Sequence, residues 1–381
     1  MIAVLFWSAV ALILYAWVGY PLLLAALAGV LDRRVEKRRI TPPVTFVITA
    51  YNEATRLRAK IENTLAQDYP AERLEVIVAS DCSSDATDAI ARTYGRVRLV
   101  RANERRGKDA AQKLALDVAS GDILVFSDVA TALSPGAVAG IVANFADPAV
   151  GCVSSVDRFV DRHGRISGEG AYVRYEMWLR RLETRVGGLV GLSGSFFAVR
   201  RDVCRLWAVD RQSDFSTALN SASLGLRAVL DTEIAGCYPD IDDERAESGR
   251  KVRTIVRGLA VLSRNVRMLN PVRYGLFAWQ LASHKLCRWL VPMAMIAAAA
   301  ANVLLLGRAA VYAVAAAAQL TFYAAAVFGA CTGARRLRIP SFVLLSHAAI
   351  LIAWWRFACG ERITHWTPSS RLAALPTPES R

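Results

Sequence analysis

Residues Gly121–Thr131 read GDILVFSDVAT, and this stretch decides the fold of the chain around it. Four apolar residues, Ile123 to Phe126, form a run typical of a buried strand, and the run ends before Ser127 and Asp128. In an open α/β sheet, ligands bind in the crevice beyond the carboxyl ends of the strands. Asp128 is therefore either a carboxylate that faces a ligand or an ordinary turn or cap residue. The surrounding chain has to decide between these two interpretations.

Three segments before this stretch show the same pattern of a strand followed by polar residues. We predict strands at residues 44–49, 74–79 and 97–100, separated by helices at about 54–67, 85–94 and 105–118. Strands that alternate with helices predict a parallel sheet, in which the carboxyl ends of the strands lie at one edge. Glu53 and Asp81 follow the first two strands, so we expect them beside Asp128. Three such residues at one edge indicate a site.

The chain after residue 150 is less regular. We predict strands at residues 153–159, 196–199 and 226–230, and a helix of mixed aromatic and charged residues at 169–185. The small-residue loop Gly191–Ser195 lacks the last glycine of a hydrolase nucleophile elbow, which argues against a serine hydrolase. A further helix begins near Asp214, and RKVRTIVRG at residues 250–258 is a basic helical stretch. Arg253 and Arg257 share one face of it by their spacing, as either a solvated face or an anion-binding face.

Composition excludes several classes of protein. The chain has 381 residues, a net charge of +14, and seven cysteines that are scattered without a CxxC pair. Four histidines also lack metal-ligand spacing, so a zinc site or a disulfide framework is not expected. No Walker A motif and no G-x-G-x-x-G follows a strand, which lowers the case for ATPases and dinucleotide dehydrogenases. The positive charge favours an anionic partner, but it gathers near apolar segments and in RKVR without a nucleic-acid-binding motif, so no nucleic acid is expected.

Both ends of the chain carry apolar segments long enough to cross a bilayer. Residues 2–31 have no charged residue, and the positive charges of Arg33–Arg39 follow them. By the positive-inside rule, the next domain is cytoplasmic, and the arginines at 335–338 agree with this orientation. The predicted organisation is that of an integral plasma (inner) membrane protein. It comprises a transmembrane helix at 1–31, a basic linker at 32–43, a cytoplasmic domain at 44–265, an amphipathic interface helix at 266–288, three transmembrane helices at 289–360 and a polar tail at 361–381, whose side of the membrane stays open.

A parallel sheet with carboxylates at its strand ends, and Arg106 and Lys108 nearby, suits a nucleoside diphosphate. A divalent cation, Mg²⁺ or Mn²⁺, would bridge a carboxylate and the two phosphates and neutralise charge on the leaving group. These expectations follow from the residues alone.

The motifs taken as a set resemble those of a membrane-embedded family 2 glycosyltransferase, inverting and polysaccharide-synthase-like, with the GT-A (nucleotide-diphospho-sugar transferase) fold. The resemblance runs from about residue 44 to 292 in the expected order. Its motifs are TAYNEA at 49–54, ASDCSSDATDAI at 79–90, RRGKDAAQ at 105–112, FSDVAT at 126–131, SGSFFAVRR at 193–201, SDF at 213–215 and RKVRTIVRG at 250–258.

The resemblance implies a role for each matched residue. Tyr51, Glu53, Asp81 and Lys108 would form the donor pocket for the nucleotide, and Asp128 would bind the metal and diphosphate. Asp214 would be the general base that deprotonates the acceptor hydroxyl. Ser193, Gly194 and Ser195 would form the acceptor loop. Arg253 and Arg257 would contact the diphosphate leaving group.

The chain departs from the family pattern at several positions. Ala130 replaces the second carboxylate of D-x-D, so the metal depends on Asp128, substrate oxygens and water. Ser213 stands where the family has Glu, and Cys82 where Gly is usual. Thr254 replaces the tryptophan of Q-x-x-R-W, so processive synthesis does not follow from the resemblance.

The leading prediction is an enzyme that moves a sugar from a nucleotide-sugar donor to a lipid-linked or growing glycan acceptor at the cytoplasmic membrane face. One alternative is a processive polysaccharide synthase that also extrudes its product. Another, of a different class, is a non-catalytic membrane module that binds a nucleotide, which the substitutions at Ala130 and Ser213 motivate.

Overall fold

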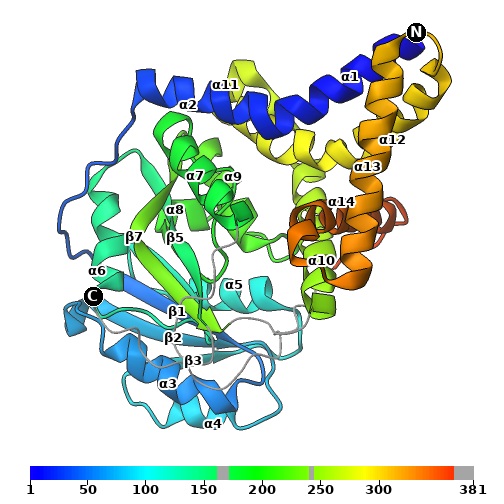
Figure 1. Cartoon of the computed structure of the whole chain (residues 1–381). Helices are drawn as coiled ribbons and strands as arrows, with labels where there is room; N and C mark the ends of the chain where they lie inside the picture. The colour runs from blue at the N-terminus through cyan, green and yellow to red at the C-terminus, as the bar shows by residue number, and fades with distance from the viewer. Residues whose placement is uncertain (161–170, 240–243, 364–381) are drawn as a thin grey trace. The chain divides into compact units, whose positions relative to one another are not determined.

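The computed structural model describes residues 1–160, 171–239 and 244–363 (Figure 1). The chain divides into two compact units. We call the first the helical unit; it contains Met1–Ala26, Asp243–Ser263 and Ala278–Arg362. The second, the sheet unit, contains Leu27–Asp242, Arg264–Phe277 and Ile363–Arg381.

The sheet unit is built on seven strands in the order β3-β2-β1-β4-β6-β5-β7 among the described residues. The strands are β1 Val44–Ala50, β2 Leu74–Ser80, β3 Val97–Arg101, β4 Ile123–Asp128, β5 Val150–Val160, β6 Phe196–Arg200 and β7 Arg227–Pro239. Strands β1 to β4 pair in parallel, as predicted. Strand β6, for which the sequence analysis predicted no direction, runs antiparallel to β4 and to β5. Its first residue, Phe196, pairs with Ser127 near the end of β4, because the loop before β6 lies at the edge where β4 ends.

The central strands are buried on both faces, which explains their continuous apolar sequence. All seven residues of β1 are buried. Phe46 and Ile48 contribute to one core, and Val47 to the core on the opposite face. This alternation places helices on both sides of the sheet, in a three-layer arrangement.

Helices on both faces of the sheet contribute buried residues to its two cores. In the sheet unit they are α3 Ala54–Leu65, α4 Thr87–Arg92, α5 Lys108–Val118, α6 Ala137–Ala143, α7 Ala171–Val186, α8 Arg201–Cys204 and α9 Ser213–Ser223 (Figure 1). Residues from α3, α4 and α6 enter the core with Phe46. Residues from α5, α7 and α9 enter the other core, with Val47.

Four helices among the described residues are long and apolar enough to cross a membrane. They span Ile2–Leu31, Pro271–Leu305, Ala310–Thr332 and Arg338–Ala358. The predicted count of one N-terminal and three C-terminal membrane helices is therefore confirmed, and the chain is a membrane protein. Residues 271–287, assigned above to an interface helix, continue directly into the helix that follows, with a non-helical residue at Gly275. The predicted tail lies, from residue 364, outside the described residues.

The N-terminal span consists of α1 Ile2–Leu14, η1 Tyr15–Gly19 and α2 Tyr20–Leu31. The basic stretch lies in α10 Glu244–Arg264. The C-terminal spans are α11 Pro271–Leu281, η5 Ala282–Cys287 and α12 Arg288–Leu305, then α13 Ala310–Thr332, then α14 Arg338–Ala358.

Candidate active site

The carboxyl ends of β1, β2 and β4 meet at one edge of the sheet. Thr49 of β1 pairs with Asp128 at the end of β4, and Ala50 pairs with Ser80 at the end of β2. The backbone N–H of Asp81 donates to the Ala50 carbonyl at 2.9 Å, which links the two strand ends directly. The strand register thus brings together the segments that carry Glu53, Asp81 and Asp128.

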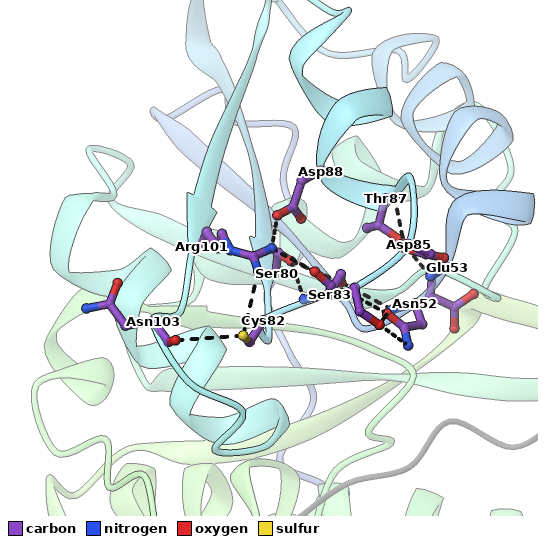
Figure 2. Close-up of polar contacts among 11 residues, drawn as sticks. Asn52, Glu53, Ser80, Cys82, Ser83, Asp85, Thr87, Asp88, Arg101 and Asn103 are labelled. Atoms are coloured by element: carbon purple, nitrogen blue, oxygen red, sulfur yellow. Dashed lines mark hydrogen bonds and ion pairs between the residues drawn. The ribbon is translucent and has the colours of Figure 1, made fainter.

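The loops after β1 and β2 hold each other in place through short polar contacts (Figure 2). The Glu53 N–H donates to Thr87 Oγ1 at 2.8 Å, and the Ser84 N–H donates to Asn52 Oδ1 at 2.8 Å. Asn52 and Cys82 both have positive φ, 53° and 57°. A left-handed non-glycine residue is rare, so two of them at facing loop positions mark backbone held under strain.

Glu53 is a buried carboxylate, 3% exposed. Burial raises the pKa of the Glu53 carboxyl, its contact with Arg56 opposes that rise, and the negative charge of Asp128 adds to it. The side chain accepts from Arg56 Nε at 2.7 Å. Glu53 and Asp128 therefore lie within electrostatic range of each other, as predicted from their places in the sequence.

Asp81 fixes the turn that leads into α5. Its carboxylate is fully buried and accepts from the N–H of Arg106 at 2.9 Å and of Gly107 at 2.9 Å. Gly107 has φ +95°, a backbone conformation that glycine adopts without strain, so its N–H can point toward the Asp81 carboxylate. The neighbouring Arg105 guanidinium lies 3.9 Å from the centre of the Tyr51 ring. The turn thus connects Asp81 to Tyr51, another residue of the predicted donor pocket.

Lys108, the first residue of α5, joins two parts of the site. Its ammonium donates to Asp128 Oδ1 at 2.5 Å and to the Gly194 carbonyl at 2.8 Å. The lysine is 9% exposed, so this pair is largely shielded from water. The structure therefore brings the predicted donor residues Lys108 and Asp128 into direct contact with the acceptor loop.

The acceptor loop also meets Asp214, in the first turn of α9. The Leu192 N–H donates to the Asp214 carbonyl at 3.1 Å, and the Asp128 N–H donates to the Ser195 carbonyl at 3.0 Å. A Cβ placed on Gly194 would lie 2.8 Å from Asp214 Oδ2. The glycine at position 194 therefore allows the Asp214 carboxylate to lie against the backbone of the loop. The next residue, Ser195, is the one whose carbonyl is bonded to Asp128.

Asp157 of β5 is a site residue that the sequence analysis missed. Its Oδ1 accepts from the hydroxyls of Ser193 and Ser195. The pairing of β5 with β6 places this carboxylate beside the acceptor loop, although the two segments are far apart in the sequence. No local pattern marks Asp157, because its partners are set by strand pairing.

Lys60 of α3 is a second missed residue. It is 2% exposed and donates to the Thr131 carbonyl at 2.7 Å, three residues after Asp128. Burial lowers the pKa of the Lys60 ammonium to about 7, and the charge of Asp128 acts against that shift. Asn63 of the same helix and Gln67, two residues beyond its end, also bind the loop after β4. The i, i+3, i+7 spacing of these three polar residues was the available signal.

Arg253 and Arg257 lie on α10. This part of α10 belongs to the helical unit, whereas the site residues described above belong to the sheet unit. Burial lowers the pKa of Arg253, and the positive charges of Arg257 and Arg250 lower it further. Three neighbouring guanidinium groups, one of them half-buried, are suited to an anion.

The residues fit a divalent cation only in part. No cluster of three or more His, Cys, Asp or Glu side chains suited to a metal occurs within residues 1–160, 171–239 and 244–363. Asp128 supplies one carboxylate, and Ala130 supplies none. This donor set suits a cation that completes its shell with substrate oxygens and water, and it does not suit a cation held by protein alone.

Part of the chain matches a known family of proteins. Residues 45–207 match the model of the family described as Glycosyl transferase family 2. The chain is 40% identical over 82 residues to the succinoglycan biosynthesis protein ExoO of Rhizobium meliloti (strain 1021), across 21% of this chain and 23% of that protein. It is 28% identical over 160 residues to the poly-β-1,6-N-acetyl-D-glucosamine synthase of Staphylococcus aureus (strain COL), across 40% of this chain and 38% of that protein. Both matches span less than half of the relative's length.

A solved structure resembles the chain over most of its length. It is the mannosyltransferase PcManGT from Pyrobaculum calidifontis in complex with GDP-Man and Mn²⁺, with a TM-score of 0.73 and 25% sequence identity. The match covers 94% of this chain and 99% of that one. The likeness includes the sheet unit and the membrane helices, so it is broader than the family match.

Proposed function

From the family 2 glycosyl transferase domain that residues 45–207 form, in a GT-A fold, we propose that this membrane protein is an inverting glycosyltransferase. It transfers a sugar from a nucleotide-sugar donor to a lipid-linked or growing glycan acceptor at the cytoplasmic membrane face. The basic residues that follow the first membrane helix support this orientation.

The observation that carries the proposal is the junction at Gly194. Its carbonyl accepts from Lys108, which also holds Asp128, and its Cα faces the Asp214 carboxylate. Donor-side and acceptor-side groups therefore meet at one loop. A transferase needs this arrangement, because the acceptor oxygen has to reach the anomeric carbon while the diphosphate leaves.

In the proposed reaction, the Asp214 carboxylate takes the proton of the acceptor hydroxyl. The acceptor oxygen then forms its bond to the anomeric carbon as the bond to the diphosphate oxygen breaks, in a single displacement that inverts configuration. Lys108 lines the donor pocket beside Asp128, and for Arg253 and Arg257 of α10 we propose the role that the resemblance implies, contact with the leaving diphosphate. Tyr51, Glu53 and Asp81 form the nucleotide pocket, and Glu53 and Asp81 also brace its loops.

The neighbour bound to Mn²⁺ supports a divalent metal requirement for this chain. Mg²⁺ or Mn²⁺, held by Asp128 and the donor's own oxygens, would supply charge neutralisation for the diphosphate. Asp128→Asn should therefore weaken donor binding more in the presence of the metal than in its absence, as measured by calorimetry. An unchanged response to the metal would place the cation elsewhere.

A processive synthase is the second candidate. The similarity to the poly-β-1,6-N-acetyl-D-glucosamine synthase favours it. Thr254, which stands where processive members of the family have tryptophan, favours transfer of a single sugar.

A donor screen tests both candidates. The purified full chain in nanodiscs is supplied with UDP-, GDP- and CDP-sugars, membrane lipid extract and Mg²⁺ or Mn²⁺, and products are identified by mass. One sugar on one lipid supports the transferase, and a ladder of polymer supports the synthase. Tight nucleotide binding without turnover of any donor would contradict both and favour a non-catalytic module.

A further inference from the structure

Helix α7 presents a stripe of arginine and tryptophan that the proposed chemistry does not use. Arg174, Trp178, Arg181 and Arg185 are spaced i, i+4, i+7 and i+11, so they share one face of a helix with 3.6 residues per turn. Arg174 and Arg181 are exposed, and Trp178 is 39% exposed.

The opposite side of α7 faces the core. Leu179, Leu182 and Val186 are buried there. Both glutamates of the helix, Glu176 and Glu183, lie on the side away from the stripe by the same helical spacing. Arg185 is ion-paired with Asp32, so the basic part of the stripe is formed by Arg174 and Arg181, with the amphipathic Trp178 between them.

The C-terminal turn of α7 is bonded to the end of the N-terminal apolar helix. Arg185 Nε donates to Asp32 Oδ1 at 2.7 Å, and Arg185 Nη2 donates to the Ala28 carbonyl at 3.3 Å. The Arg33 N–H donates to the Arg185 carbonyl at 3.1 Å. Ala28 belongs to the last turn of the Ile2–Leu31 span, so these contacts tie α7 to the point where the chain leaves that span.

We propose that the Arg174–Trp178–Arg181 face of α7 is a docking surface for the headgroups of anionic membrane lipids. Arginine pairs with phosphate, and tryptophan lies at the level of the headgroups with its ring in the apolar boundary. Arg33, whose N–H is bonded to Arg185, and Arg34, which is ion-paired with Asp32, are further exposed basic residues that follow the membrane helix. A membrane is the occupant because one end of the face is bonded to a membrane helix.

Docking of α7 would act directly on the acceptor loop. Arg180 of the same helix donates to Ser154 Oγ at 2.8 Å and to the Gly191 carbonyl at 3.3 Å. Ser154 Oγ in turn accepts from the Ser193 N–H at 2.8 Å. Lipid bound to the outer face of α7 would thereby set the position of the loop that receives an amphiphilic acceptor.

Photo-cross-linking in nanodiscs tests the docking surface without using turnover as its readout. p-Benzoylphenylalanine replaces Trp178 in the full chain, or replaces the exposed Ala59 of α3 as a control. The nanodiscs contain phosphatidylcholine alone or with phosphatidylglycerol, and adducts are identified by mass spectrometry. We expect a lipid adduct at position 178 that increases at least about threefold with phosphatidylglycerol, and little lipid adduct at 59.

Charge variants sharpen the test. Arg174→Glu with Arg181→Glu should remove most of the lipid adduct, whereas the two lysine substitutions should keep it. Arg92→Glu with Arg96→Glu, an equal charge change at exposed positions elsewhere in the sheet unit, should have no effect. Equal adducts at 178 and 59, equal adducts in both lipid mixtures, or a protein adduct at 178 would each overturn the proposal. The lipid comparison decides the matter even if the double glutamate variant fails to fold.

Discussion

Replacing Lys60 by methionine should keep or raise the stability of the protein at pH 7 and lower its affinity for the donor. The ammonium is buried, donates to the Thr131 carbonyl at 2.7 Å and lies 5.3 Å from the centre of the Phe46 ring. Methionine fills nearly the same space without the charge. It leaves the carbonyl unbonded, which costs about 1–3 kcal/mol, and removes the larger penalty of a desolvated cation. We therefore expect Lys60→Met to be at least as stable as the wild type at pH 7.

The pH dependence of stability follows from the two pKa values of Lys60. The unfolded chain keeps the proton up to the ordinary value of 10.5, and the folded protein releases it above about 7. Between these values the unfolded state binds more protons, so the wild type gains stability as the pH rises through that window. From pH 7 to pH 9 the gain is about 2 kcal/mol, and the methionine variant should lack it.

The assay compares unfolding of the two proteins in nanodiscs at pH 7, 8 and 9. Lys113→Met, at a partly exposed lysine ion-paired with Asp117, is a control that should follow the wild type. Donor affinity is measured in parallel. It should fall about tenfold, because Lys60 supports the loop after Asp128 and adds positive charge near it. Parallel stability curves for Lys60→Met and wild type would refute the buried-cation argument. Unchanged donor affinity would refute the positioning role.

Three further substitutions follow from the same geometry. Asp214→Asn should lower turnover by about 10²–10⁴-fold and leave donor affinity unchanged, because it removes a base and little volume; normal turnover would refute the assignment. Gly194→Ala should lower turnover about a hundredfold, because the new Cβ would lie 2.8 Å from Asp214 Oδ2 and displace it. Gly136→Ala is the control: a Cβ there meets open space, so turnover in the same kinetic assay should not change. Cys82→Gly should raise the free energy of unfolding by about 0.5–1 kcal/mol by relieving a positive φ, and Cys82→Ala, which keeps the strain, should not.

The strand ends were predictable because their signals are local. A buried parallel strand is a short apolar run, and the polar residue that ends it is read directly from the sequence. Glu53, Asp81 and Asp128 could therefore be placed at one edge before the sheet order was known. The structure brings Lys108 into contact with Asp128, and the roles of both residues in donor binding stay predictions.

The sequence analysis missed two residues for different reasons: the position of Asp157 depends on the pairing of distant strands, and Lys60 is an exception to the rule that lysine is exposed. Asp157 reaches Ser193 and Ser195 only because β5 lies beside β6, and the antiparallel direction of β6 is itself set by where the preceding loop lies. Lys60 looked like a solvated residue of a polar helix, since lysine is seldom fully buried. The roles of Arg253 and Arg257 remain predictions, because these residues belong to the helical unit and the other site residues belong to the sheet unit.

The two lysines change the meaning of Ala130. A second carboxylate at that position would add negative charge beside Asp128, and the site would then need a cation before a diphosphate could approach. With Ala130, Asp128 is balanced by Lys108 in direct contact and by Lys60 within electrostatic range. Protein cations thus supply part of the positive charge that a diphosphate requires. The single carboxylate is consistent with a donor site in which a metal and Lys108 share the neutralisation of the leaving group. Lys60, with a pKa lowered to about 7 by burial, adds positive charge there only in its protonated form.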